Sequence, residues 1–272
     1  MSDGVQHDLI FDLGLHRGED TAFYLKKGFR VVGVDANPVL CAAVAREFAG
    51  AVAAGRLTIV NRAIADVAGT VAFHEPEHSV WGTIDPAWAE RNRRQGHASR
   101  VRTVEATTVA ALLAEHGVPY YAKIDIEGMD RIALAGFGSA AARPRYLSIE
   151  SDKRSLAAVA GEIAAFADLG YDRFKVVAQH RVPDQRLPDP PREGAAAAHR
   201  FAEGSSGAFG AEAPGDWLSA DAALAAYRPI FRRYALIGDD GWIRGRWPRA
   251  LAHRLGLRAG WYDTHARLSD DR

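Results

Sequence analysis

Carboxylate side chains follow two β-rich runs in the middle of the chain, where they could act on a bound substrate. Asp125 and Glu127 end the run YYAKIDIE, and Glu150 ends RYLSIE with Asp152 just beyond it. A carboxylate within hydrogen-bond reach of a hydroxyl can accept its proton. We take Asp125 as the first candidate for such a base, followed by Glu127 and by His180, which ends a later run.

Each of these residues also allows another interpretation. Asp125 could bind a cofactor amino group or cap the next helix. Glu127 could form an ion pair with Lys123 or Arg131, which are close to it in sequence. His180 has no partner that the sequence identifies, and such histidines are often structural.

The same carboxylates offer hard oxygen ligands for a cation such as Mg²⁺, which would make a substrate hydroxyl more acidic. No motif with fixed ligand spacing supports such a site. We therefore expect a metal-free site, and if a metal binds, its candidate ligands are Asp125, Glu127, Glu150 and Asp152.

A glycine-containing loop follows the first β-rich run and leads into a predicted helix. Its pattern is Asp12-x-Gly14-x-x-x-Gly18, with His16 where a dinucleotide-binding loop has its second glycine, and it has no phosphate-loop lysine. The second run ends in Asp35, about 20 residues beyond the first glycine, where a carboxylate can accept both hydroxyls of a ribose. These features favour a ligand with a ribose but no pyrophosphate.

S-adenosylmethionine (SAM) meets that description. Asp12 and the backbone of 14–18 would face its methionine end, and Asp35 would face its ribose. The alternative is that the two glycines only permit a tight turn and that Asp35 caps a helix.

Short β-rich runs alternate with amphipathic stretches, the pattern of βαβ units. We expect an α/β fold with a seven-stranded, mostly parallel sheet and helices on both faces. The predicted strands are 9–13, 30–35, 57–61, 120–126, 145–150, 173–180 and 232–238, and the predicted helices are 19–28, 38–54, 108–117, 129–137 and 154–169. A hairpin is expected around Ala68 and Gly69, followed by an irregular segment over 76–100.

Four segments over about residues 8–150 resemble the FkbM family of SAM-dependent methyltransferases. The K-x-D-x-E-G block at 123–128 is the most specific of them. The matching positions are Asp12, Gly14 and Gly18; Asp35, Asn37 and Pro38; Asn61, Ala63 and Asp66; Lys123, Asp125, Glu127 and Gly128; and Leu134 with Gly136. The chain departs from the family pattern at Val109, where many members have Leu-Asp, and in an insertion over 181–229.

The resemblance implies a class I methyltransferase fold with SAM as cofactor. It also implies O-methylation, often of sugars or secondary metabolites. The expected cofactor site comprises Asp12, Gly14, His16, Gly18, Asp35, Ala36, Asn61, Ala63 and Asp125.

The composition limits the partners of the protein. Lys and Arg together number 34, as do Asp and Glu, so no net charge draws the chain to nucleic acid. The single cysteine, Cys41, excludes an internal disulfide. We expect neither a signal segment nor a membrane span, because the first residues are polar and no run reaches roughly 20 apolar residues. We expect a cytoplasmic protein that acts on a small-molecule or glycan acceptor and makes no stable membrane insertion.

We expect a methyltransferase domain over 1–238 and a C-terminal extension over 239–272. The insertion 181–229 is rich in Gly, Pro, Ser and Ala, and we expect a substrate lid in which Phe201, Phe209 and Trp217 stack on the acceptor. A disordered surface loop is the alternative.

Two other segments allow two interpretations each. Ser79 and Trp81 could cover the methionine end of SAM or belong to an ordinary loop. An apolar stripe of Trp247, Leu251 and Leu255 could pack on the domain or lie on a membrane surface.

The leading functional hypothesis is a SAM-dependent O-methyltransferase acting on a carbohydrate or secondary-metabolite hydroxyl. The rival hypotheses are a nucleotide-dependent oxidoreductase on a Rossmann sheet and a protein that binds SAM without catalysis.

Overall fold

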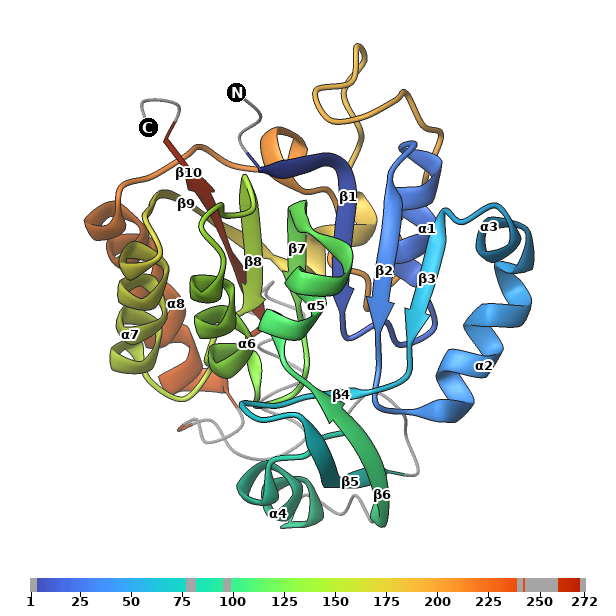
Figure 1. Ribbon diagram of the computed structural model, residues 1–272. Helices are drawn as coiled ribbons and strands as arrows, with labels where there is room; N and C mark the ends of the chain where they lie inside the picture. Colours follow the sequence, from blue (N-terminus) through green and yellow to red (C-terminus); the bar gives the residue numbers. More distant parts are fainter. Residues whose placement is uncertain (1–3, 77–81, 95–98, 239–241, 243–258, 270–272) are drawn as a thin grey trace.

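The computed structural model describes residues 4–76, 82–94, 99–238, 242 and 259–269. Its central sheet has seven strands in the order β3-β2-β1-β7-β8-β10-β9 (Figure 1). Strand β10 is antiparallel to both of its neighbours, and the other pairs are parallel. The strands are β1 (Val5–Leu13), β2 (Arg30–Val34), β3 (Leu57–Val60), β7 (Val118–Ile124), β8 (Tyr146–Glu150), β9 (Tyr171–Ala178) and β10 (Tyr262–Leu268). This is the predicted class I methyltransferase fold.

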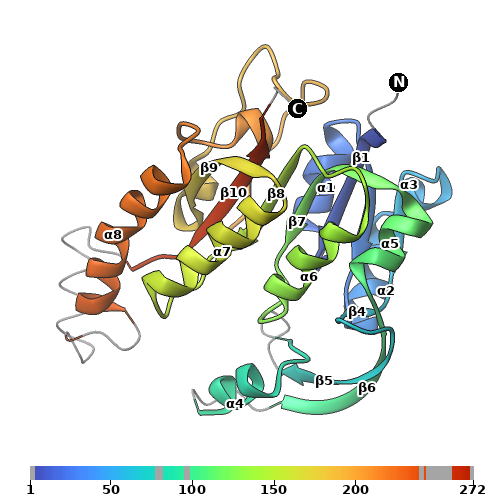
Figure 2. The same ribbon diagram turned by 60° about the vertical axis from the view of Figure 1, so that its left-hand side comes forward.

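Helices cover one face of the sheet, where the larger hydrophobic core lies (Figures 1 and 2). They are α5 (Val109–His116), α6 (Asp130–Gly136), α7 (Leu156–Asp168) and α8 (Ala220–Ile237). Successive side chains of β1 point to opposite faces of the sheet and so contribute to two different cores. Leu9, Phe11 and Leu13 point into this core, whereas Ile10 and Asp12 point to the opposite face.

The opposite face carries α1 (Glu19–Lys26), α2 (Pro38–Glu47) and α3 (Ala49–Ala53), and the insertion packs beside them. The ring of Phe209 is fully buried and stacks on Tyr121 with centroids 4.5 Å apart. Phe201 packs edge-on against Phe23, and Trp217 stacks on Tyr146. The expectation that the three insertion rings stack on an acceptor is therefore wrong, because all three pack onto the sheet or α1.

The prediction of a last strand at 232–238 is also wrong. These residues lie at the end of α8 and just beyond it, and Pro229 lies inside that helix. The seventh strand is β10, within the segment that we assigned to a C-terminal extension. It was missed because its buried residues include the polar Asp263, Thr264 and His265, which hide the apolar pattern of a core strand.

A second sheet and helix α4 (Pro86–Arg94) lie beyond the carboxyl ends of the central strands (Figure 1). The sheet contains β4 (Ala63–Ile64), β5 (Gly69–Pro76) and β6 (Ser99–Thr107). The predicted hairpin between the first two of these strands is wrong, since β4 and β5 each pair with β6. Three short 3₁₀ helices complete the assignment: η2 (Phe137–Ser139), η3 (Gln179–Asp184) and η4 (Gly210–Glu212).

Within the described residues, every helix is too short or too polar to cross a bilayer. Two sets of residues singled out in the sequence lie outside the described residues, namely Ser79 and Trp81, and Trp247, Leu251 and Leu255.

The insertion should contribute to stability as a core element does. We expect Phe209→Ala to lower the free energy of unfolding by about 3–5 kcal/mol, because it removes a fully buried ring. Glu203→Ala, an exposed position in the same insertion, should change it by less than about 0.5 kcal/mol. Denaturant unfolding of both variants measures the difference, and equal stability would show that the insertion does not pack as described.

Candidate active site

A cavity of about 630 Å³ lies at the carboxyl ends of the central strands, next to the second sheet. It is lined by residues that follow β1, β2, β7 and β8 and by Asp263 of β10. Ligands of open α/β sheets bind at this end of the strands. The cavity is large enough for a cofactor together with a small acceptor.

Two glycines shape the loop between β1 and α1. Gly14 has φ 95°, and a Cβ there would clash with the carbonyl oxygen of Asp125. Gly18 has φ 81° and is the N-cap of α1, where a Cβ would press on the ring of Phe48. Other residues would be strained at both positions. The loop therefore runs close to the end of β7 and leads directly into the helix.

Asp35 is held at the end of β2 by backbone groups. Its carboxylate oxygens accept hydrogen bonds from the backbone N–H groups of His16 and Asn37, each at 2.8 Å. Asn61 donates to the backbone carbonyl of Asp35 at 2.9 Å. Burial raises the pKa of Asp35, which lines the cavity. Each carboxylate oxygen has a second lone pair, so the fixed side chain can still accept a hydroxyl hydrogen bond.

The structure brings most of the predicted cofactor residues to the cavity. The lining includes Gly14, His16, Asp35, Ala36, Ala63 and Asp125. Asp12, Gly18 and Asn61 are not part of the lining. Gly18 is the N-cap of α1, and Asn61 donates a hydrogen bond to the backbone of Asp35.

Lys123 is buried in the wall of the cavity and joins three carboxylates. Its Nζ is 3.5 Å from Asp12 Oδ1, 3.4 Å from Asp20 Oδ2 and 3.5 Å from Asp125 Oδ2. It also donates to the carbonyl oxygen of Gly14 at 3.1 Å. Burial acts to lower the pKa of Lys123, but the three carboxylates raise it well above its usual value. Lys123 thus stays charged and ties the glycine loop and α1 to β7.

Sequence reasoning placed Lys123 in the family motif and named it as a possible ion-pair partner of Glu127. The structure pairs it with Asp125 instead. The available signal was its spacing of two residues from Asp125, because side chains at that spacing on a strand share a face.

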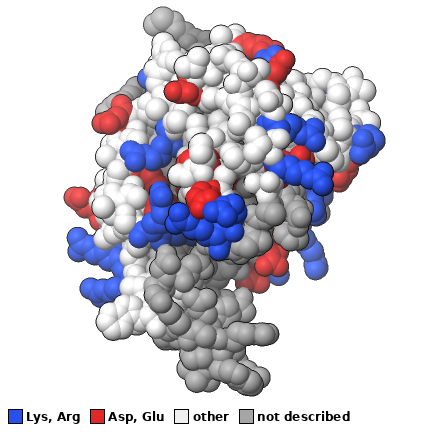
Figure 3. Space-filling view, turned by 90° about the horizontal axis from the view of Figure 1, so that it is seen from below, with Lys and Arg blue, Asp and Glu red and all other residues white. Residues whose placement is uncertain are grey.

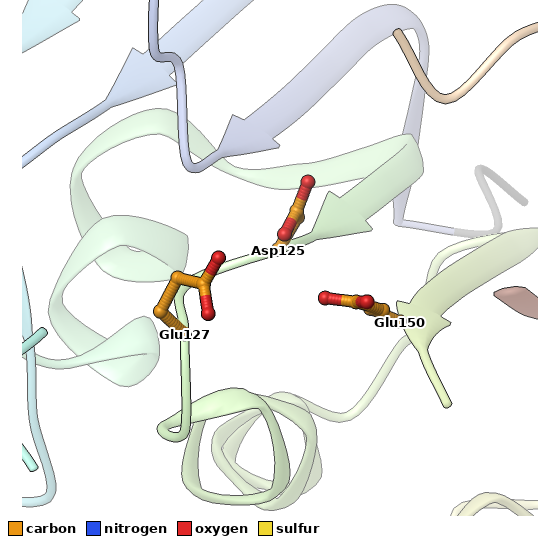
Figure 4. Close-up of side chains that lie close together, drawn as sticks. All are labelled: Asp125, Glu127 and Glu150. Carbon is orange, nitrogen blue, oxygen red and sulfur yellow. The ribbon is translucent and has the colours of Figure 1, made fainter. Parts of the chain in front are cut away.

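Three carboxylates converge at the ends of β7 and β8 (Figure 4). One oxygen each from Asp125, Glu127 and Glu150 lies within 4.8 Å of the others. Trp88 Nε1 donates to Glu127 Oε2 at 2.8 Å, and Thr83 Oγ1 donates to the backbone carbonyl of Glu127 at 2.6 Å. Thr83, together with Trp88 of α4, therefore holds Glu127, whose φ of 49° is uncommon for a residue other than glycine.

The crowding of these acids affects their protonation. Burial, followed by the charges of Asp125 and Glu150, raises the pKa of Glu127 to about 8. Burial and the charge of Asp125 raise the pKa of Asp130 to about 7, although Asp130 accepts hydrogen bonds from the backbone N–H groups of Ile126 and Gly128. These raised pKa values indicate that the surrounding residues do not fully stabilise the negative charge of the clustered carboxylates.

Two predicted site residues do not join the cluster. His180 is not part of the cavity lining, and its ring packs edge-on against Tyr262 with centroids 5.8 Å apart. Asp152 borders the cavity, but its carboxylate is bound by the backbone N–H and the guanidinium of Arg154 and by the backbone N–H of Ser155. Neither residue is placed to act with Asp125.

Asp263 is a cavity residue that sequence reasoning missed. It lies on β10 directly opposite Glu150 in the sheet register and lines the same cavity. It was overlooked because we assigned its segment to an extension outside the sheet.

Basic residues surround the acidic interior on the face at the carboxyl ends of the strands. Figure 3 shows Lys and Arg side chains gathered around a smaller group of Asp and Glu side chains on this face. Those that border the cavity and are exposed are Arg62, Arg131, Lys153 and Arg154. The rim of the cavity therefore attracts anions, whereas its interior attracts cations.

Comparison with known proteins agrees with this class of fold. A family model described as the methyltransferase FkbM domain matches residues 12–172, which is more than half of the chain. The chain therefore belongs to the FkbM methyltransferase family and is a SAM-dependent methyltransferase. No curated protein sequence gives a significant match.

Three solved structures of low sequence identity are among those that match the chain. A putative sarcosine dimethylglycine methyltransferase from Galdieria sulphuraria is 11% identical, with 96% of this chain and 77% of that chain covered and a TM-score of 0.38. Geranyl diphosphate methyltransferase in complex with SAM is 9% identical, with coverages of 99% and 80% and a TM-score of 0.37. Precorrin 8w decarboxylase from Methanobacterium thermoautotrophicum is 13% identical, with coverages of 74% and 80% and a TM-score of 0.31.

The buried lysine should be essential to the fold of the site. We expect Lys123→Met to lower the free energy of unfolding by about 3–5 kcal/mol, because Asp12 and Asp20 would be left buried without their counter-charge. Lys26→Met, on the exposed side of α1, should change it by less than about 0.5 kcal/mol. Chemical denaturation of both variants measures this, and a Lys123→Met protein as stable as the parent would contradict the described network.

Proposed function

We propose that this enzyme transfers the methyl group of SAM to a hydroxyl of a carbohydrate or secondary-metabolite acceptor. The observation that carries the proposal is the convergence of Asp125, Glu127 and Glu150 in the cavity that also contains Asp35 and the glycine loop. A ribose-binding carboxylate at one end and proton-accepting carboxylates at the other suit methyl transfer to a protic acceptor.

The cofactor would lie across the carboxyl ends of β1 and β2. Asp35 would accept hydrogen bonds from the ribose hydroxyls, and the loop from Gly14 would run beside the methionine end. This orientation directs the sulfonium toward the end of β7, where Asp125 lies. Since the loop, Asp35 and Asp125 are fixed by backbone contacts and by Lys123, the protein would pay little reorganisation energy on binding.

The reaction then needs one proton acceptor. The acceptor oxygen attacks the methyl carbon, the new O–C bond forms, and the C–S bond breaks with its electron pair going to sulfur. The products are the methyl ether and neutral S-adenosylhomocysteine, and the hydroxyl proton passes to Asp125 and then to solvent. Glu127 is less suited to this step, because one of its oxygens already accepts a hydrogen bond from Trp88.

We further propose that the enzyme works in the cytoplasm on a diffusible small molecule or glycan. Cys41 is buried and unpaired, which suits a reducing compartment. The basic rim would help to capture an acceptor that carries a phosphate or carboxylate in addition to its hydroxyl.

Substitution of Asp125 tests its role. We expect Asp125→Asn to lower the turnover number by about 10²–10⁴ while SAM affinity stays within a few-fold of the parent, because the amide cannot accept the proton. The measurements are S-adenosylhomocysteine formation, with an acceptor found by screening sugars and natural products, and calorimetric titration with SAM.

His180→Gln is the matched control, since the structure places that ring outside the cavity lining. It should keep the parent turnover. Parent-like turnover in Asp125→Asn, or a product methylated at nitrogen, would contradict the proposal.

A further inference from the structure

The group of Asp125, Glu127 and Glu150 has the ligand geometry of a cation site. Their oxygens come from the end of β7, the turn after it and the end of β8, and they lie within 4.8 Å of one another and face one another across a gap (Figure 4). Acidic groups often gather on protein surfaces without binding an ion, so the group needs independent support.

Asp263 supplies that support. Its side chain is 6% exposed and lines the same cavity. It is directly opposite Glu150 in the antiparallel register of β10 and β8, so the two side chains share a face of the sheet. Within the described part of the chain, its carboxylate has no hydrogen-bond or ion-pair partner. A buried carboxylate in this state is costly while it is charged, and a bound cation would stabilise the charged form.

The nearby basic side chains are already engaged. Lys123 is shared among Asp12, Asp20 and Asp125. Lys153 forms an ion pair with Glu150, but its side chain is 40% exposed, so solvent screens the interaction. Arg154 is bound to Asp152. Among these carboxylates, Asp125 therefore has a shared ion pair with Lys123, and Glu150 has a screened one with Lys153.

The chemistry of the donors selects the kind of cation. All four side chains offer carboxylate oxygens, with no histidine or cysteine among them, and such hard ligands suit Mg²⁺, Mn²⁺ or Ca²⁺ more than Zn²⁺ or copper. Carboxylates from three strand ends also leave room for water or an acceptor oxygen on the cavity side.

We propose that Asp125, Glu127, Glu150 and Asp263 form a binding site for one divalent cation of the Mg²⁺ type. The set differs from the one expected from sequence, because Asp263 replaces Asp152. The site itself is independent of the acceptor. Its catalytic use rests on the proposed function: a bound cation would make the acceptor hydroxyl more acidic, so that a carboxylate suffices as its base.

Metal binding is tested without SAM and without acceptor. The full chain, stripped of metal, is titrated with Mn²⁺ and followed by calorimetry and by the electron paramagnetic resonance signal of free Mn²⁺. We expect one ion per chain, with affinity weakened at least about tenfold in Glu150→Gln and in Asp263→Asn, since each loses a charged ligand. Thermal unfolding of each variant verifies that it is folded.

Asp152→Asn is the matched control, because Asp152 borders the cavity with its carboxylate held by Arg154. It should bind Mn²⁺ as the parent does. Absence of binding up to about 10 mM Mn²⁺, far weaker than functional sites of this type, would overturn the proposal. So would equal affinity in the parent and in both ligand variants, because the ion would then bind away from Glu150 and Asp263.

The catalytic use has a separate readout. We expect EDTA to abolish S-adenosylhomocysteine formation and Mg²⁺ or Mn²⁺ to restore it. If Mn²⁺ binds as expected but EDTA leaves turnover unchanged, the catalytic use is wrong and the site stands. If Mn²⁺ binds but no hydroxyl acceptor is methylated, the proposed function fails independently of the site.

Discussion

The pairing of the buried Lys123 ammonium group with three carboxylates is the interaction on which the rest of the site depends. This lysine joins Asp12 of β1, Asp20 of α1 and Asp125 at the end of β7, and it holds the carbonyl of Gly14. Charges of this kind are stable inside a protein only when they are paired. Because one lysine pairs with three elements, the glycine loop, the first helix and the candidate base are positioned together.

This arrangement requires that water be excluded from one face of the sheet, and the insertion covers that face. Phe209 and its neighbours cover Tyr121 on the same face of β7 as Lys123. The backbone N–H of Ser206 donates to Asp20 Oδ1 at 2.8 Å. A segment that looked like a mobile lid therefore completes the core beneath the active site. Its contact with the cavity is limited to Gly204 and Ser206.

The parts that sequence predicted were those with local signals. Strands β1, β2 and β7 are apolar runs, and the glycine loop and Asp35 follow a recognised spacing. The missed parts depend on distant neighbours. Lys123 meets Asp12 across 111 positions, and β10 is buried with polar residues because β8 and β9 flank it. Pro229 misled the prediction of α8, since a proline normally marks a helix boundary.

The central claim is that the cavity directs the methyl group of SAM toward the carboxylates at the ends of β7 and β8. A crystal structure of the SAM complex tests it most directly. We predict ribose hydroxyls within hydrogen-bond distance of Asp35 and the sulfonium methyl pointing at Asp125. A cofactor whose ribose lies away from Asp35, or whose methyl group points away from Asp125, Glu127 and Glu150, would contradict the account.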